Sequence, residues 1–190
     1  MKRRHSCGPV SFVEDMKTRI DIVFGYPGSG KSTLISQMIS LCADCGSVIH
    51  FDGGSSLTSV TAAHLAQLIR KNRPNRVLLE SSAKPDAFCQ LFALEGLASQ
   101  AYKGTQALVI DASHFIGGVA AEREYTETYL RLADIVFVSH ATRLSVRDRH
   151  AALARVWEMN RHLNVAVEPY TGVDLWRMFD LPSGKYCVRR

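Results

Sequence analysis

A short segment between an apolar stretch and a helical pattern constrains the fold of this chain more than any other feature. Residues 25–32 are Gly-Tyr-Pro-Gly-Ser-Gly-Lys-Ser, which matches the pattern G-x-x-x-x-G-K-[ST]. The segment follows a predicted strand at 19–24 and opens a predicted helix at 31–42, which is the context that the motif requires. A chance match is expected in roughly one chain of this length in a hundred. The sequence therefore predicts a phosphate-binding loop, or P-loop.

Each residue type in this loop suits a nucleoside triphosphate. The glycines let successive backbone N–H groups surround phosphate oxygens. Lys31 would neutralise the β- and γ-phosphates, and the Ser32 hydroxyl would ligate Mg²⁺. We expect nucleotide contacts from Gly25, Pro27, Gly28, Ser29, Gly30, Lys31, Ser32 and Thr33. The expected cofactor is Mg²⁺, and the expected ligand is GTP or ATP.

Apolar segments alternate with helical patterns along the rest of the chain. The predicted strands are 19–24, 47–51, 76–80, 107–111, 134–139 and 165–167. The predicted helices are 31–42, 61–70, 86–100, 121–132, 145–161 and 173–179. Continuously apolar strands that alternate with helices indicate a mainly parallel sheet covered on both faces. The expected fold class is therefore α/β, a three-layer P-loop NTPase sandwich.

Length and composition favour one domain. A chain of 190 residues suits a single nucleotide-binding domain at 19–182, with a basic segment at 1–18 before it and a tail at 183–190 after it. No apolar run approaches the ~18 residues of a membrane span, and no secretory signal is evident, so we expect a cytoplasmic protein. The net charge of +5 is not interleaved with aromatic residues, so neither a nucleic acid nor a membrane is an expected partner.

Carboxylates follow three of the predicted strands, at the edge of the sheet where ligands of such folds bind. Asp52 follows the second strand, Glu80 the third and Asp111 the fourth. Glu80 ends an apolar strand as a Walker B acid does, and would hold the Mg²⁺ shell through water. Asp52 is the leading candidate to orient a hydrolytic water. The candidate catalytic residues are thus Lys31, Asp52 and Glu80, with Ser32 and Glu80 at the metal.

These motifs resemble the GTPase domain of the CobW/HypB/UreG family of metallochaperone-associated proteins. Residues 80–82, Glu-Ser-Ser, are similar to the family's Glu-Thr/Ser-Ser/Thr-Gly motif, and Asp52-Gly53 is similar to its Asp-x-Gly neighbourhood. Residues 108–112 and 133–138 are similar to its apolar strand ending in Asp-Ala and to the strand before its guanine-reading motif. The likeness covers residues 19–170 and implies an NTPase that forms a nucleotide-dependent homodimer and serves a client protein.

Three departures separate phosphate binding from the family's other functions. The family's Asn-Lys-x-Asp falls at 139–142, where the sequence is Ser-His-Ala-Thr, so the carboxylate that reads guanine is missing there and base preference stays open. Ala83 stands where the family has a glycine beside the γ-phosphate. The family's metal-binding Cys-x-Cys-Cys is absent from 53–60.

A replacement metal site has little support in the sequence. Cys42 and Cys45 have C-x-x-C spacing, but a tetrahedral site needs about four ligands, and only His5 and Cys7 at the amino-terminal end could complete one. Buried, reduced thiols are the favoured interpretation. His140, within the altered base motif, could stack on a base edge.

Three functions remain open. The first is a Mg²⁺-dependent NTPase whose loops near 52–57 and 82–86 change between nucleotide states. The second is a small-molecule or nucleotide kinase, with a lid of arginines at Arg123, Arg131, Arg143, Arg147 and Arg149. The third is a partner-binding module that senses nucleotide without significant turnover.

Overall fold

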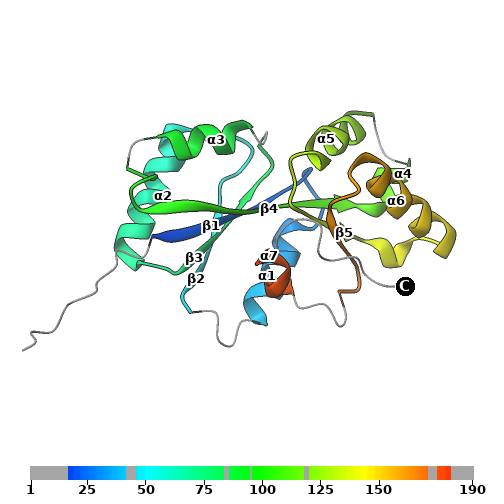
Figure 1. Cartoon of the computed structure of the whole chain (residues 1–190), viewed down its shortest axis with the longest axis horizontal. Helices are drawn as coiled ribbons and strands as arrows, with labels where there is room; N and C mark the ends of the chain where they lie inside the picture. Colours follow the sequence, from blue (N-terminus) through cyan, green and yellow to red (C-terminus); the bar gives the residue numbers. More distant parts are fainter. Residues whose placement is uncertain are drawn as a thin grey trace, which may run out of the picture.

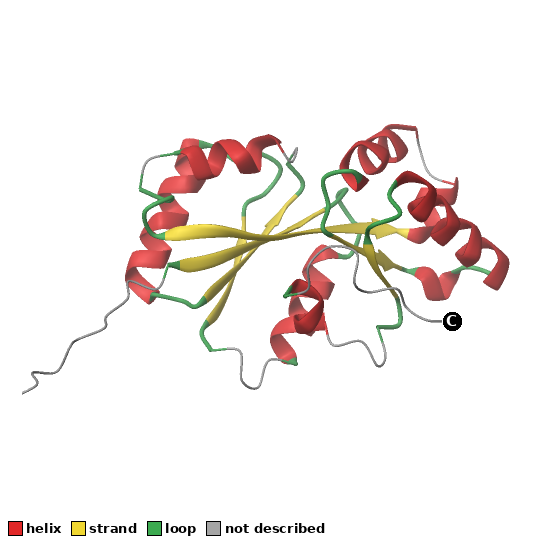
Figure 2. Cartoon of the chain, viewed as in Figure 1, coloured by secondary structure: helices red, strands yellow, loops and turns green. Residues whose placement is uncertain are grey.

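Six parallel strands form one sheet at the centre of the molecule, with helices on both faces (Figures 1 and 2). This computed structural model describes residues 17–41, 46–83, 86–94, 96–117, 120–170 and 175–180. The strands are β1 (Thr18–Phe24), β2 (Val48–Asp52), β3 (Arg76–Ser81), β4 (Ala101–Asp111), β5 (Ile135–Ser139) and β6 (Asn164–Val167). The helices are α1 (Lys31–Ser40), α2 (Ser59–Asn72), α3 (Asp86–Ala93), α4 (Ala112–Gly117), α5 (Ala120–Leu130), α6 (Val146–Met159) and α7 (Leu175–Phe179), with a 3₁₀ turn, η1, at Ala141–Arg143.

The strand order places the glycine-rich loop in the middle of the sheet. The order is β2-β3-β1-β4-β5-β6, and every described pair is parallel. The loop leaves the carboxyl end of β1, between β3 and β4. Because parallel strands share their carboxyl ends, the residues after β2, β3, β4 and β5 lie along the same edge as the loop.

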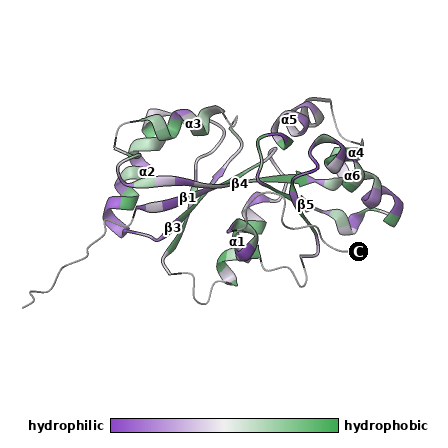
Figure 3. Ribbon diagram, viewed as in Figure 1, coloured by the Kyte–Doolittle hydropathy of each residue, from purple (hydrophilic) through white to green (hydrophobic). Residues whose placement is uncertain are grey.

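Two apolar layers hold the helices to the sheet. Helices α1 and α7 cover one face, where Val23, Met38 and Phe137 are fully buried (Figure 1). Helices α2 to α6 cover the other face, around Phe24, Phe88 and Val156. The helices carry both hydrophobic and hydrophilic residues, as expected of elements that pack on one side and meet water on the other (Figure 3). The predicted three-layer α/β class is confirmed.

The region between β3 and β5 differs from the prediction. The helix predicted at 86–100 ends at Ala93, and β4 begins at Ala101, six residues before the strand predicted at 107–111. Gly104 allows this extension, since a Cβ there would lie 2.1 Å from Asp21 Oδ1 and 2.6 Å from Arg19 Nε. The first half of β4, at 102–106, is largely polar, so the apolar pattern in the sequence indicates only the second half of the strand. Helix α4, which was not predicted, follows β4 directly.

The sheet begins one residue before the predicted start of the domain at residue 19. Strand β1 begins at Thr18, the last residue of the segment assigned as a basic extension, and Thr18 Oγ1 donates a 2.7 Å hydrogen bond to Pro74 O. Residues 1–16, the tail at 183–190, and Cys42 and Cys45 lie outside the described residues. None of the helices described is both long enough and apolar enough to cross a membrane.

Candidate nucleotide-binding site

The loop at 25–32 has a backbone that only glycine accommodates well at several positions. Gly28 and Gly30 have φ angles of 83° and 90°, in the left-handed region. Gly25 packs directly over β4, because a Cβ there would lie 2.3 Å from the carbonyl oxygen of Val109. The loop is therefore held against the sheet as a compact ring, with α1 beginning at Lys31.

The side chain of Lys31 lies inside the loop and is bonded to its backbone. Its Nζ donates hydrogen bonds to Gly25 O at 3.2 Å and Tyr26 O at 3.0 Å, and its side chain is buried. Burial lowers the pKa of Lys31, while the nearby charges of Glu80 and Asp52 act in the opposite direction. The ammonium group is thus placed within the loop where triphosphate oxygens would sit in such a motif.

Ser32 and Glu80 meet at the first turn of α1. Ser32 Oγ donates a 2.7 Å hydrogen bond to Glu80 Oε1, and His50 Nε2 lies 2.9 Å from Glu80 Oε2. The strand register explains the meeting, since Glu80 pairs with Val23 of β1 on one side and with Asp52 of β2 on the other. A hydroxyl and a carboxylate in contact are the hard oxygen donors that Mg²⁺ prefers, so this pair fits the ion.

His50 is a part of this cluster that the sequence analysis did not single out. It lies inside β2, two residues before Asp52, and the period of two along a strand places both on the same face. That spacing, next to a strand ending in a carboxylate, was the available signal.

Asp52 lies beside the metal-binding candidates without contacting them through a hydrogen bond. Its Oδ1 accepts a 2.8 Å hydrogen bond from Gly54 N, and its side chain is exposed. Gly53 N donates to Glu80 O at 2.8 Å, which ties this turn to the end of β3. Asp52 therefore lies near Lys31 and Glu80, but its carboxylate accepts a hydrogen bond from the backbone of the turn that follows it.

The backbone amides that follow Glu80 are hydrogen-bonded to Ser81 and to the turn after β2. Ala83 is 3% exposed, and its N–H donates to Ser81 Oγ at 2.9 Å. Ser82 N donates to Gly54 O at 2.9 Å, so the turns after β2 and β3 are joined. The amide that would meet a γ-phosphate at Ala83 already has a partner in this conformation.

The residues after β4 and β5 form the other half of this edge. Ser139 Oγ lies 2.6 Å from Ser29 O of the loop and 3.0 Å from Ile110 O. Asp111 contacts His140, with Oδ2 and Nδ1 2.7 Å apart, and accepts hydrogen bonds from Ser113. Burial alone would raise the pKa of Asp111, but these bonds together hold it below its usual value. Thr142 is exposed in η1.

Four aromatic residues connect the glycine-rich loop and the end of β1 to helix α5. Tyr26 packs edge-on against Tyr125 of α5, with ring centroids 5.8 Å apart, and Tyr125 packs against Tyr129 at 4.2 Å. Tyr129 contacts Phe24, 6.1 Å away, at the end of β1. We call these four residues the aromatic chain. Tyr125 also places its hydroxyl 3.5 Å from Ala83 O.

The described arginines considered as a kinase lid are spread over three places in the chain: the end of α5, η1 and α6. Arg131 is exposed just after α5, Arg143 is exposed in η1, and Arg147 is exposed on α6. Arg149, also on α6, donates from Nε to Ala141 O at 3.2 Å. The side chain of Arg123 lies outside the described part of the chain. Nothing in the placement of the other four gathers them over the loop.

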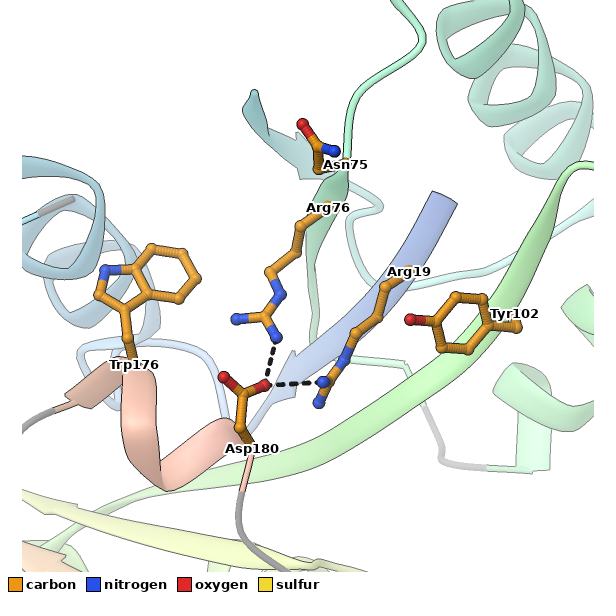
Figure 4. A pocket seen from close by; sticks show the side chains of 6 residues that line it. All are labelled: Arg19, Asn75, Arg76, Tyr102, Trp176 and Asp180. Carbon is orange, nitrogen blue, oxygen red and sulfur yellow. Dashed lines mark hydrogen bonds and ion pairs between the residues drawn. The ribbon is translucent and has the colours of Figure 1, made fainter. Parts of the chain in front are cut away.

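A pocket of about 330 Å³ lies at the opposite, amino-terminal end of the strands (Figure 4). Arg19 and Arg76 are register partners on β1 and β3, and both point at Asp180, with nitrogen–oxygen distances of 2.7 and 2.5 Å. Both also contact the fully buried Asp21, Arg19 Nε at 2.9 Å and Arg76 Nε at 3.0 Å. Arg76 lies over the ring of Trp176, 5.2 Å from its centroid. Two arginines and two aspartates balance in charge, so this cluster fastens α7 to the sheet.

Within the described ranges, no three His, Cys, Asp or Glu side chains come together as a transition-metal site. Cys42 and Cys45, like His5 and Cys7, fall outside those ranges.

Comparisons with known proteins agree with this architecture. No protein-family model matches the sequence, and no curated protein matches it. Among solved structures, the chain is similar to the zinc-bound YjiA GTPase from E. coli, with a TM-score of 0.61 and 15% identity over 91% of this chain and 67% of that one. It is also similar to the hydrogenase maturation factor HypB from Archaeoglobus fulgidus, with a TM-score of 0.53 and 14% identity over 88% of this chain and 89% of that one.

This chain shares the fold of the YjiA and HypB proteins. The resemblance to the CobW/HypB/UreG GTPases, first suggested by short motifs, is confirmed at the level of that fold. Identities this low say nothing of substrate, so the roles of individual side chains rest on the geometry described above.

Proposed function

We propose that this protein binds a Mg²⁺-nucleoside triphosphate at the loop of residues 25–32 and hydrolyses it. The contact between Ser32 Oγ and Glu80 Oε1 carries the proposal, because it joins the first turn of α1 to the end of β3, and this hydroxyl and this carboxylate would hold Mg²⁺. Lys31 would leave the carbonyls of Gly25 and Tyr26 to bind the β- and γ-phosphates.

The chain's own residues divide the work as follows. Loop amides would orient the phosphates, with Gly25, Pro27, Gly28, Ser29, Gly30 and Thr33 around them. Ser32 and Glu80 would hold Mg²⁺, which supplies charge neutralisation between the β- and γ-phosphates. Asp52 would orient the attacking water after its bond to Gly54 N is released. A homodimer and a client protein are further expectations from the family resemblance, as is a cytoplasmic location from the composition.

The test is a direct measurement of binding and turnover. Calorimetric titration with GTP, ATP, GDP and ADP in the presence of Mg²⁺ would be combined with phosphate-release kinetics. We expect at least one triphosphate to bind, and Lys31→Ala to abolish its binding while the circular dichroism spectrum is retained. If wild-type protein binds none of the four nucleotides, the proposal is wrong. Transfer of phosphate to an added acceptor would instead indicate a kinase.

A second candidate, a nucleotide sensor with little turnover, is favoured by Ala83. Its methyl group is buried and its N–H is already bonded to Ser81 Oγ, so the amide is not free to meet a γ-phosphate. Under this alternative, Lys31→Ala abolishes binding, whereas Glu80→Ala and Asp52→Ala leave an already negligible phosphate release unchanged. Measurable wild-type turnover that falls in Glu80→Ala would exclude it.

A further inference from the structure

Two buried polar atoms at the end of β6 have no hydrogen-bond partner within the part of the chain that the structure describes. They are Glu168 Oε2 and the hydroxyl of Tyr170. Burying an unpaired polar atom costs free energy, and native proteins keep few such atoms, each of which is explained by a bound water, an ion, a ligand or a strained functional site. Two of them within three residues therefore indicate a place where a polar group is received.

Glu168 lies next to the residue that contacts the glycine-rich loop. Its N–H donates to Val138 O at 2.9 Å, which continues the pairing of β6 with β5 by one residue beyond Val167. Ala166 and Phe137 belong to the same apolar layer under α1, and alternation along each strand places Glu168 and Ser139 on that same face. Ser139, on β5, contacts the loop through its hydrogen bond to Ser29 O. Glu168, directly after β6, is the neighbour of Ser139 on that side.

Tyr170 lies beside Glu168 in the same corner of the structure. Its ring packs edge-on against Phe137, with centroids 5.7 Å apart. Burial raises the pKa of Tyr170, and the negative charge of Glu168 raises it further, so the two side chains are close enough to interact. The ring of Tyr170 thus supplies apolar surface beside Glu168, and the lower local dielectric strengthens any hydrogen bond that the carboxylate accepts there.

We propose that Glu168 is the residue that selects the nucleotide base, in place of the aspartate missing at Thr142. Guanine offers two adjacent donors, its N1–H and its 2-amino group, and a carboxylate accepts from both. Adenine presents an acceptor at N1 and has no 2-amino group, so a carboxylate in this position rejects it. The inference rests on the proposed function, since it assumes a triphosphate bound at the loop, and it assigns guanine as the base.

The test compares four triphosphates, GTP, ITP, XTP and ATP, by calorimetric titration with Mg²⁺. Wild-type protein should bind GTP best, ITP more weakly because inosine lacks the 2-amino group, and ATP about 100-fold more weakly than GTP. Glu168→Gln offers an amide with one acceptor and one donor, which matches the N1–H and the 2-carbonyl of xanthine. The variant should weaken GTP about 100-fold, strengthen XTP, and leave ATP within about twofold.

The control is Glu158→Gln, the same chemical change at an exposed position on α6. It should leave all four affinities unchanged. Equal wild-type affinity for GTP and ATP would overturn the inference even if Glu168→Gln failed to fold. A folded Glu168→Gln with an unchanged ratio of GTP to XTP affinity would overturn it too. Either result leaves the proposed function standing, whereas wild-type protein that binds no triphosphate defeats the proposed function itself.

Discussion

Ser32 and Glu80 are 48 residues apart in the sequence, and the Ser32 hydroxyl donates a 2.7 Å hydrogen bond to the Glu80 carboxylate. The parallel pairing of β1 with β3 creates this contact, because it brings the end of β3 beside the loop that follows β1. His50 holds the second carboxylate oxygen of Glu80. The carboxylate is therefore fixed in position before any ligand arrives, an arrangement that lowers the entropic cost of assembling a metal site.

Removing the charge of Glu80 should uncouple nucleotide binding from magnesium. In Glu80→Gln the amide still fills the space between Ser32 and His50, but it no longer attracts a divalent cation. We expect added Mg²⁺ to raise the affinity of wild type for a triphosphate, and to raise the affinity of Glu80→Gln by a factor about tenfold smaller. Titration with and without the ion measures both increases. Glu124→Gln, at an exposed position on α5, is the matched control. An identical Mg²⁺ response in Glu80→Gln and wild type would remove Glu80 from the metal site.

The buried ammonium of Lys31 should make stability depend on pH. Burial lowers its pKa below the ordinary value of 10.5, so over the interval between these values the unfolded chain binds more protons than the folded one. The free energy of unfolding contributed by Lys31 therefore increases as pH rises through that interval. The measurement is urea unfolding of nucleotide-free wild type and Lys31→Met at pH 7 and pH 9.5. The free energy of unfolding of wild type, relative to that of Lys31→Met, should be higher at pH 9.5 than at pH 7. A difference that is constant, or that shifts the other way, contradicts the burial argument.

Gly25 should tolerate no side chain. A methyl group there would lie 2.3 Å from the Val109 carbonyl oxygen, and neither backbone can yield without moving the loop off β4. Gly25→Ala should lower the free energy of unfolding by about 2 kcal/mol and weaken triphosphate binding at least tenfold. Gly117→Ala, at the end of α4 where nothing lies within 4 Å of an added Cβ, should change neither quantity appreciably. The comparison uses chemical denaturation followed by titration.

The cluster at the opposite end of the strands should matter for stability and not for nucleotide binding. Arg76→Met would leave the buried Asp21 with Arg19 as its remaining guanidinium partner and would remove a link to Asp180. We expect the free energy of unfolding to fall by about 2 kcal/mol, seen as a Tm lower by roughly 4–8 °C, while affinity for a triphosphate is retained. Arg70→Met, exposed on α2, serves as the control and should melt like wild type. Loss of binding in a folded Arg76→Met would show that the two ends of the sheet are coupled.

The strands and the loop could be predicted because their signals are local. An apolar run followed by a glycine-rich motif specifies β1, its turn and α1 without knowledge of the rest of the chain. The carboxylates after β2, β3 and β4 could be placed along one edge because parallel strands share their direction. His50 and Glu168 could not be assigned in the same way, since their importance depends on which strand lies beside which.

The start of β4 and the presence of α4 could not be predicted from the sequence. Polar residues at 102–106 hide the first half of that strand, and only the close approach of Gly104 to Asp21 and Arg19 explains why the strand is so long. Helix α4 begins without a loop because the Asp111 carboxylate accepts from the Ser113 N–H. Such tertiary arrangements leave no periodic pattern for a sequence to display. The predicted roles of Asp52, Ser32 and Glu80 in chemistry remain predictions that the experiments above address.

The aromatic chain of Phe24, Tyr26, Tyr125 and Tyr129 places helix α5 in contact with the glycine-rich loop. Tyr26 contacts Tyr125, Tyr125 contacts Tyr129, and Tyr129 contacts Phe24 at the end of β1. The Tyr125 hydroxyl also lies 3.5 Å from Ala83 O, in the turn after β3. One helix on the surface of the sheet therefore touches both segments that are expected to surround the terminal phosphates, and Tyr125 is the side chain that joins them.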